Sequence, residues 1–357
     1  VAEDKTLTYS GTAINVGANT ITLSGGGSLV SGGMTLNNAQ SKLLLNSITL
    51  DSASTSANSL GIDVDANSTV TSLSVGHTTP VSIKANRTLS GSITVTAGSI
   101  KLGETGTLGS SVTMSGGTLE ADATLTLSGP LTQSGNITIA VAENKTLGYT
   151  GGDIDVGSNT LSIGGAGTFS NANNNALVLD SSDSILDLSG TGTITGPVKL
   201  EGGTLKASAG SPTISGALTQ YNNAIIEVAS NQTLNYTGAS LNVGAKTLTL
   251  SGGGTFNNTN ALVLNHGASL LAFAGILAIG DLECTVPSKT GRGIQVLSSA
   301  TLGNYDLSVM NYLSLAADQT LAGQLNLKTN GELRTAGAGQ FIGDIALAGG
   351  KFHSHNQ

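Results

Sequence analysis

The sequence predicts an all-β protein, a right-handed parallel β-helix (β-solenoid) with about 19 residues per coil, and three observations support this. Small polar and β-branched residues alternate with Leu and Ala along the chain, which is typical of short strands and tight turns. Charged residues make up only 10% of the chain and aromatic residues 3%, whereas glycine numbers 50, which is unlike an ordinary globular domain. Finally, the chain contains internal repeats, and these decide the architecture.

The clearest repeat is a unit that begins with the pattern VAx(D/N)xTLxYxG. In each copy a Val-Gly motif follows fifteen residues after the start, and a glycine-rich turn comes next. Three equivalent copies occupy residues 1–33, 141–171 and 228–258. Residues 83–119 and 315–352 also resemble each other. We therefore predict a single continuous solenoid over residues 1–357.

A shorter motif sets the predicted length of one coil. It consists of an apolar residue, two variable residues, a polar residue and then Thr or Ser before another apolar residue, and it starts at Val64, Ile83, Leu102, Leu119 and Val141. These starts lie about 19 residues apart, and one coil cannot bury its apolar face alone but must stack on the next. At the spacing of neighbouring strands, about 4.8 Å, roughly 18 coils would form a rod on the order of 80–90 Å long.

Asparagine and aspartate recur at one position of this motif. Seven Asn-x-Ser/Thr sequons occur in the chain, and four of them coincide with this position. Asn and Asp tolerate the left-handed backbone conformation and hydrogen-bond to their own backbone. We predict that the motif places a corner of the coil at Asp4, Asn67, Asn86, Asn144, Asn231 and Asp318.

Residues 281–292 (DLECTVPSKTGR) interrupt the pattern, because Pro287, Lys289 and Arg292 cluster there. Such a stretch predicts a loop extruded from one coil. The repeat also relates the two ends of the chain: a second copy placed after the first would resume the pattern after about 16 residues. We therefore expect either a longer tandem array or end-to-end self-association through the terminal coils.

Parallel β-helices include enzymes that cleave polysaccharides, so paired carboxylates were weighed as catalytic candidates. Asp63 and Asp65 share one strand face, as do Asp153 and Asp155. The latter pair is replaced by Ala and Asn in the first copy and by Ser and Asn in the third, as is typical of solvent-facing positions. The three arginines, Arg87, Arg292 and Arg334, share no motif. We predict no catalytic residues.

Metal and cofactor chemistry is also not expected. Apart from the pair His353 and His355, the histidines His77 and His266 are scattered, and a frayed tail explains that pair better than a metal site. Cys284 is the only cysteine and has no evident His partner, so we predict an incidental or buried thiol. Two tyrosines and two phenylalanines occupy equivalent repeat positions and are predicted to serve the core: Tyr149, Tyr236, Phe169 and Phe256.

Charge and hydropathy exclude two classes of partner. The net charge is −8 with 14 basic residues and no basic run, which argues against nucleic acid. The longest apolar stretch, Ser269 to Gly280, is too short to span a bilayer, so no membrane insertion is expected.

The repeated style TLxxSGxLTxSGxxTIAVAENKTL resembles the β-helical passenger regions of bacterial autotransporters and filamentous-haemagglutinin-type adhesins. The resemblance implies a chain secreted across a bacterial envelope, extracellular or on the cell surface, where a stiff stalk or fibre presents a binding end to a glycan or protein receptor. It supplies no site residue. The alternative is a polysaccharide-binding or polysaccharide-cleaving β-helix, similar to tailspikes or lyases.

Overall fold

The structure, a computed structural model, describes residues 1–171, 175–275, 278–289 and 291–354. It divides into two compact units. Unit 1 comprises Val1–Asp155 and Asn159–Ala176, and unit 2 comprises Val156–Ser158 and Leu177–Gln357. The single continuous solenoid expected over residues 1–357 stays a prediction, and each unit is described by itself.

Each turn of unit 1 contributes one strand to a parallel ladder, here called the principal ladder. The rest of the turn forms either one long strand or two short strands of a second ladder, here called the split ladder. The principal ladder of unit 1 contains β3 (Thr20–Ser24), β6 (Lys42–Asn46), β8 (Gly61–Val64), β10 (Thr79–Ile83), β12 (Ser99–Leu102), β15 (Thr118–Ala121), β18 (Ile137–Val141) and β21 (Thr160–Gly165). The remaining strands of unit 1 are β1 (Thr6–Thr8), β2 (Ile14–Asn15), β4 (Ser28–Val30), β5 (Met34–Leu36), β7 (Thr49–Thr55), β9 (Ser68–Val75), β11 (Thr88–Val95), β13 (Thr107–Leu108), β14 (Ser111–Met114), β16 (Leu125–Leu127), β17 (Leu131–Gln133), β19 (Thr146–Tyr149), β20 (Ile154–Asp155) and β22 (Thr168–Asn171).

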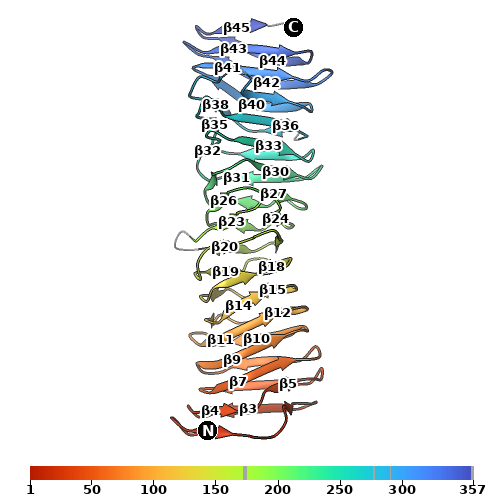
Figure 1. Cartoon of the computed structure of the whole chain (residues 1–357), viewed down its shortest axis with the longest axis vertical. Coiled ribbons are helices and arrows are strands. Elements are labelled where there is room, and N and C mark those ends of the chain that lie inside the picture. The colour runs from red at the N-terminus through yellow and green to blue at the C-terminus, as the bar shows by residue number, and fades with distance from the viewer. Residues whose placement is uncertain (172–174, 276–277, 290, 355–357) are drawn as a thin grey trace. The chain divides into compact units, whose positions relative to one another are not determined.

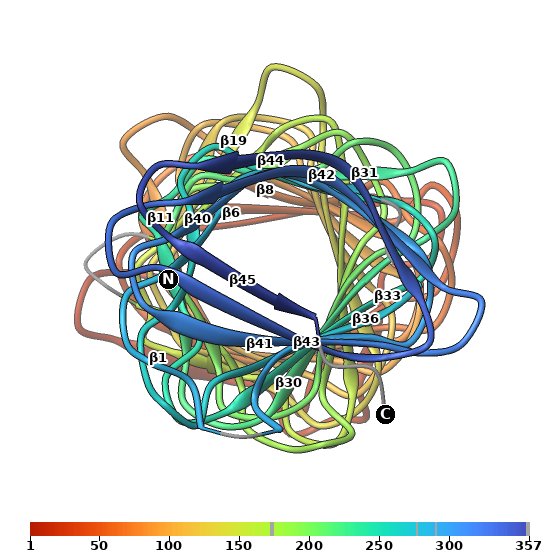
Figure 2. The same ribbon diagram turned by 90° about the horizontal axis from the view of Figure 1, so that it is seen from above.

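Unit 2 follows the same plan. Its principal ladder contains β24 (Ile185–Leu188), β27 (Thr204–Ala207), β30 (Ala224–Val228), β33 (Thr247–Ser251), β36 (Leu270–Ala274), β39 (Gly293–Val296), β41 (Met310–Leu315), β43 (Glu332–Gly337) and β45 (Lys351–Ser354). Its remaining strands are β23 (Leu177–Leu179), β25 (Thr193–Ile194), β26 (Val198–Leu200), β28 (Thr213–Ile214), β29 (Leu218–Gln220), β31 (Thr233–Tyr236), β32 (Leu241–Asn242), β34 (Thr255–Asn258), β35 (Leu262–Leu264), β37 (Ala278–Ile279), β38 (Leu282–Cys284), β40 (Ala300–Leu307), β42 (Thr320–Leu327) and β44 (Gln340–Leu347). Figure 1 shows the successive turns within each unit lying one above the other, and Figure 2 shows the same turns end on.

The predicted all-β parallel solenoid is confirmed, because the described residues form parallel ladders and contain no helix. The two units together hold about 16 turns with roughly 21 residues per turn, so the coils expected from the sequence were too many and too short. Some turns do have the predicted length, as where Leu43 pairs with Ile62 of the next turn. Others are longer, since Ile139 meets its partner only at Ile163. The short motif detects the tightest turns, and longer connections between strands raise the mean.

Inward-facing aliphatic side chains form continuous columns within each unit. In unit 1 one column runs through β6, β8, β10, β12 and β15, where all five inward side chains are buried. Its members are Leu43, Ile62, Val81, Leu102 and Ala121. Each contacts an apolar residue in the turn above and below, which removes from water the face that a single turn would leave exposed.

Most of the predicted corners are left-handed. Asp4, Asn86, Asn144, Asn231 and Asp318 have φ between 56° and 62°, so the prediction from the motif is confirmed at five positions. The sixth residue, Asn67, does not adopt positive φ. There the side chain serves instead as an acceptor, since its Oδ1 receives a hydrogen bond from the Thr88 amide at 3.0 Å.

The aromatic residues at equivalent repeat positions lie in the core, as predicted. Tyr149 stacks on Phe169 with ring centroids 6.3 Å apart, and Tyr236 stacks on Phe256 at 6.1 Å. All four side chains are buried. Each tyrosine stabilises the turn before it, because its hydroxyl oxygen accepts a backbone N–H bond from that turn.

The loop predicted over residues 281–292 is shorter than expected. Leu282–Cys284 form strand β38, which pairs with β35 and β40, so the prediction is wrong for these three residues. The connection to β39 begins only at Thr285. Thr290, which also falls in the predicted loop, lies outside the described residues.

Candidate functional surfaces

The first pair of candidate carboxylates is held by lysines of neighbouring turns. Asp63 Oδ2 lies 2.6 Å from Lys42 Nζ, and Asp65 Oδ1 lies 2.8 Å from Lys84 Nζ. The hydrogen bond with Asp65 raises the pKa of Lys84 above its usual value. The two carboxylates therefore link turns of unit 1.

The second pair lies beside β20, whose buried Ile154 separates Asp153 from Asp155. Both carboxylates thus face outward, as the alternation predicted. Asp153 Oδ1 accepts a hydrogen bond from the Ala176 amide at 2.7 Å, which fixes the connection between two segments of unit 1. This contact holds the backbone at Ala176 in place.

Cys284 lies inside unit 2 and not in a loop. Its side chain is fully buried, and Sγ lies 3.3 Å from the carbonyl oxygen of Val286. Burial raises the pKa of the thiol, which disfavours the reactive thiolate. The prediction of a buried thiol is confirmed, while its placement in the loop is wrong.

The described histidines belong to different units: His77 to unit 1, and His266 and His353 to unit 2. His77 and His266 are exposed, and Nδ1 of His266 accepts the Ala268 amide at 3.0 Å. His353 belongs to β45, where Nε2 lies 3.6 Å from Glu332 Oε1; His355 lies outside the described residues. Within the described ranges no group of three or more His, Cys, Asp or Glu is placed to hold a metal ion.

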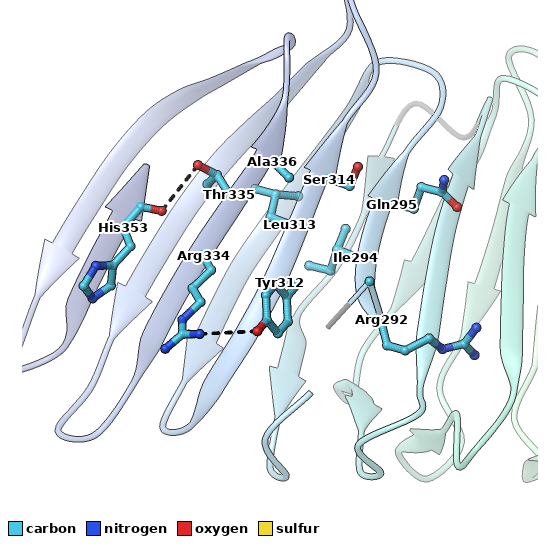
Figure 3. A pocket seen from close by; sticks show the side chains of 11 residues that line it. Arg292, Ile294, Gln295, Tyr312, Leu313, Ser314, Arg334, Thr335, Ala336 and His353 are labelled. Atoms are coloured by element: carbon cyan, nitrogen blue, oxygen red, sulfur yellow. Dashed lines mark hydrogen bonds between the residues drawn. The ribbon is translucent and has the colours of Figure 1, made fainter. Parts of the chain in front are cut away.

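A groove on the outward face of unit 2 gathers residues that the sequence did not connect. It has a volume of about 580 Å³, and its lining includes Arg292, Tyr312, Arg334 and His353. Figure 3 shows Tyr312 between the two arginines, with the Arg334 and His353 side chains pointing to the same side of the sheet. Strand pairing places these residues together, since Tyr312 pairs with Arg334 and Arg334 with His353. The groove could not be predicted from the sequence, because its two arginines are separated by about two turns of chain.

Two further surfaces carry exposed apolar side chains that face along the stack. In unit 1 the first turn exposes Leu7 and Tyr9. In unit 2 the strand β44 exposes Ile345 and Leu347. These positions continue columns of buried residues, so their exposure marks faces on which no further turn is packed in this structure.

No family model matches the chain, and neither the curated proteins nor the solved structures provide a match. None of the described residues forms a helix long and apolar enough to cross a membrane. What the described residues display on their own is a parallel solenoid with lysine–carboxylate pairs between its turns.

Proposed function

We propose that this chain is a non-catalytic structural and adhesive β-solenoid, a stiff segment of an extracellular or cell-surface bacterial stalk or fibre that either stacks end to end with further copies of itself or belongs to a longer tandem array. The observation that carries the proposal is that each turn buries its inward apolar side chains only against the neighbouring turns, so that such side chains are exposed in the first and last described turns. The same ladder positions one or two turns further inside each unit are buried.

In unit 1 this gradient runs through three paired residues. Leu7 pairs with Leu29 and Leu29 pairs with Leu50. Leu7 is 56% exposed, Leu29 6% and Leu50 0%. A turn packed on the open side of β1 would bury Leu7 as β1 buries Leu29, and each fully buried leucine contributes about 1.5–3 kcal/mol.

In unit 2 the gradient runs the opposite way along the chain. Leu325 pairs with Ile345 and Leu327 with Leu347. The two leucines of β42 are fully buried, whereas Ile345 is 40% and Leu347 61% exposed. The open face of unit 2 thus offers the same aliphatic chemistry as the open face of unit 1.

A further turn of the same kind, from a second copy or from a longer array of repeats, is the occupant that fits both faces. Only a turn with parallel strands and an aliphatic interior continues the columns and supplies partners for the backbone groups of an edge strand. The chain itself favours this occupant, because the third repeat copy buries against its neighbouring turns the leucine that the first copy exposes. Contact between the two faces is heterologous and generates filaments when the rotation does not close.

The non-catalytic part of the proposal is supported by the contacts of the candidate acids. Asp63, Asp65 and Asp153 are engaged in links between turns. The extracellular location and the adhesive role are supported by the repeated style of the sequence, which resembles passenger regions of secreted adhesins. A host-cell or surface glycan or protein is the class of receptor that this role implies.

Electron microscopy and sedimentation over a range of concentrations test the proposal. We expect unbranched filaments that grow with concentration, and we expect Leu347→Lys to abolish them by placing a charge in the contact. Leu297→Lys is the matched control, because Leu297 is 50% exposed but lies in a turn after β39 and outside either open face.

Three outcomes would overturn the proposal. A monodisperse monomer at high concentration would exclude end-to-end stacking, and so would filaments that survive Leu347→Lys. Turnover of any polysaccharide by the purified chain would exclude a purely structural role.

A further inference from the structure

We propose that the outward groove over β39, β41, β43 and β45 of unit 2 binds saccharides that carry carboxylate groups. The proposal does not rest on filament formation, since the groove faces sideways from the stack, although its lining reaches β45, the last described strand of unit 2. Its volume, about 580 Å³, falls within the range of about 300–1,000 Å³ that is typical of small-ligand sites.

The groove carries positively charged side chains. Two of the three arginines of a chain with net charge −8 line this one groove. Arg292 uses neutral acceptors: Nε donates to the Ala268 carbonyl at 2.8 Å, and Nη2 lies 3.5 Å from the Lys246 carbonyl. Its charge is therefore not matched by a carboxylate in these contacts, and a ligand carboxylate would complement it.

Arg334 supplies the second cationic position. Its Nε lies 2.5 Å from Glu332 Oε1, and Nη1 donates to the Tyr312 hydroxyl at 3.4 Å. A guanidinium has five N–H donors in a planar fork, and these two contacts use only part of the fork. Glu332 therefore orients Arg334 and leaves donors with which it can hold a carboxylate.

Beside the Arg334 cation the groove also offers an aromatic surface. The Arg334 guanidinium lies 5.9 Å from the centre of the Tyr312 ring, and Tyr312 is held in register with it by the pairing of β41 and β43. Figure 3 shows the ring beside the guanidinium at the centre of the groove. An aromatic ring with an apolar body and a polar tip offers a platform for the flat face of a sugar.

The position of the groove on the sheet favours a saccharide over an acidic peptide. Extended peptides bind β-structure mainly by adding a strand at a sheet edge. This groove lies on the face of the principal ladder, where backbone groups are already paired between β39, β41 and β43. The additional outward polar groups of the lining are the side chains of Gln295 and Ser314, which match the hydroxyl groups of a sugar.

The spacing favours a ligand with more than one acidic ring. Arg292 directly precedes β39 and Arg334 belongs to β43, two ladder steps further on. The Arg292 guanidinium reaches back to Ala268 and Lys246 of the two preceding turns, so the two guanidinium groups lie more than two steps, which is more than about 10 Å, apart along the stack. A short acidic oligosaccharide would reach both arginines and lie across Tyr312.

Calorimetric titration of the full chain with oligogalacturonate tests the proposal, with the methyl-esterified oligomer as the neutral probe. We expect saturable binding of the acid and at least tenfold weaker binding of the ester. Arg334→Gln should weaken binding by about tenfold or more, because a charge-assisted hydrogen bond is lost. The affinity of Arg334→Lys, which keeps the charge but loses the planar fork, should lie between the affinities of the parent chain and of Arg334→Gln.

Arg87→Gln is the matched control. Arg87 is the third arginine and belongs to unit 1, so its loss should change the affinity less than twofold. The variants of Arg334 alter an exposed side chain, and unchanged thermal melting would show that they fold. Should one fail to fold, Tyr312→Ala provides a second test with the same expected loss.

The proposal is overturned if oligogalacturonate does not bind or binds no better than its ester. Equal weakening by Arg87→Gln and Arg334→Gln would reveal nonspecific attraction and also overturn it. Tighter binding of a poly-glutamate peptide than of oligogalacturonate would assign the groove to peptides instead.

Discussion

Residues 1–33 and residues 228–258 carry copies of the same repeat unit, yet the two copies bury their side chains differently. Leu7 and Tyr9 of the first copy are 56% and 46% exposed, whereas Leu234 and Tyr236 of the third are fully buried. The second copy agrees with the third, since Tyr149 is also fully buried. The same local sequence thus produces an exposed or a buried face according to what is stacked against it.

The third copy also makes hydrogen bonds that depend on the turn before it. The Leu218 amide donates to Tyr236 Oη at 3.1 Å, and the hydroxyl donates in turn to the carbonyl oxygen of Ala239. The second copy repeats the first of these bonds between Leu131 and Tyr149. Whether a repeat unit is buried in this fold therefore depends on the neighbouring turns and not on the sequence of the unit alone.

We expect the largest difference in stability between the copies when their tyrosines are replaced. Tyr236→Ala should lower the free energy of unfolding of unit 2 by about 3–5 kcal/mol, because it leaves a cavity beneath Phe256 and removes the acceptor for the Leu218 amide. Tyr9→Ala should cost less than about 0.5 kcal/mol, as is usual for exposed positions. Urea denaturation of the two variants measures both values, and equal losses would contradict the role of stacking.

A glycine of the repeat unit gives the second contrast. Gly252 has φ of 102°, and a Cβ there would lie 2.3 Å from the carbonyl oxygen of Val228. Gly252→Ala should therefore cost about 1–3 kcal/mol. A Cβ on the equivalent Gly25 would lie at a similar distance from the carbonyl oxygen of Val1. Because Val1 lies in the open first turn and can move away, Gly25→Ala should cost less. Thermal melting of the two variants measures both losses. A larger loss at Gly25 would reverse the contrast.

The left-handed corners give a smaller contrast. Asn231 has φ of 62°, a conformation that costs alanine about 1–2 kcal/mol and glycine nothing. Asn231→Ala should lower the stability of unit 2 by about 1 kcal/mol, and Asn231→Gly should leave it nearly unchanged. The corresponding change Asp4→Ala should have a smaller effect, since the first copy is packed on one side only. Chemical denaturation of the three variants would check this order.

The smallest expected effect concerns pH and the end of the first copy. The Ser31 and Gly32 amides donate to Asp51 Oδ2 at 3.0 and 3.1 Å. Burial acts to raise the pKa of Asp51, but hydrogen bonds from Ser31, Ser52 and Gly32 outweigh it and lower the pKa. A lowered pKa means that the carboxylate stabilises the fold above its unfolded pKa of about 3.9 and loses this effect as the pH falls through the folded value.

Asp51→Asn tests that pH dependence. At pH 7 the variant should be less stable than the parent chain by less than about 1 kcal/mol, because the side chain is partly exposed. As the pH falls below about 3.9 the difference should shrink toward zero, since the unfolded chain takes up the proton first and the folded chain does so at lower pH. A difference that grows on acidification would assign Asp51 the opposite role.

The fold class and most of the left-handed corners could be predicted from the sequence. Period and alternation are local patterns, so the parallel solenoid, the left-handed Asn144 and the buried Tyr149 could all be predicted. Turn length could not, because connections such as the one that separates Ile139 from Ile163 vary without changing the strand motif. The place of Cys284 in a strand was missed as well, since the nearby Pro287 indicates a loop.

The candidate surfaces depend on register, which the sequence pattern does not define closely enough. Arg292 and Arg334 meet on one groove only because β41 pairs with β43 so that Tyr312 lies opposite Arg334, a longer offset than the motif predicts. A shift of one residue would turn Tyr312 into the core. Which side chains lie together across neighbouring turns can thus be determined only from the observed strand pairing.

Hydrogen–deuterium exchange of dilute, monomeric protein tests the central claim that stacking protects the repeat unit. Residues 146–149 and 233–236 should exchange slowly and residues 6–9 rapidly, although the three segments have nearly the same sequence. Equal protection of all three segments would contradict the claim.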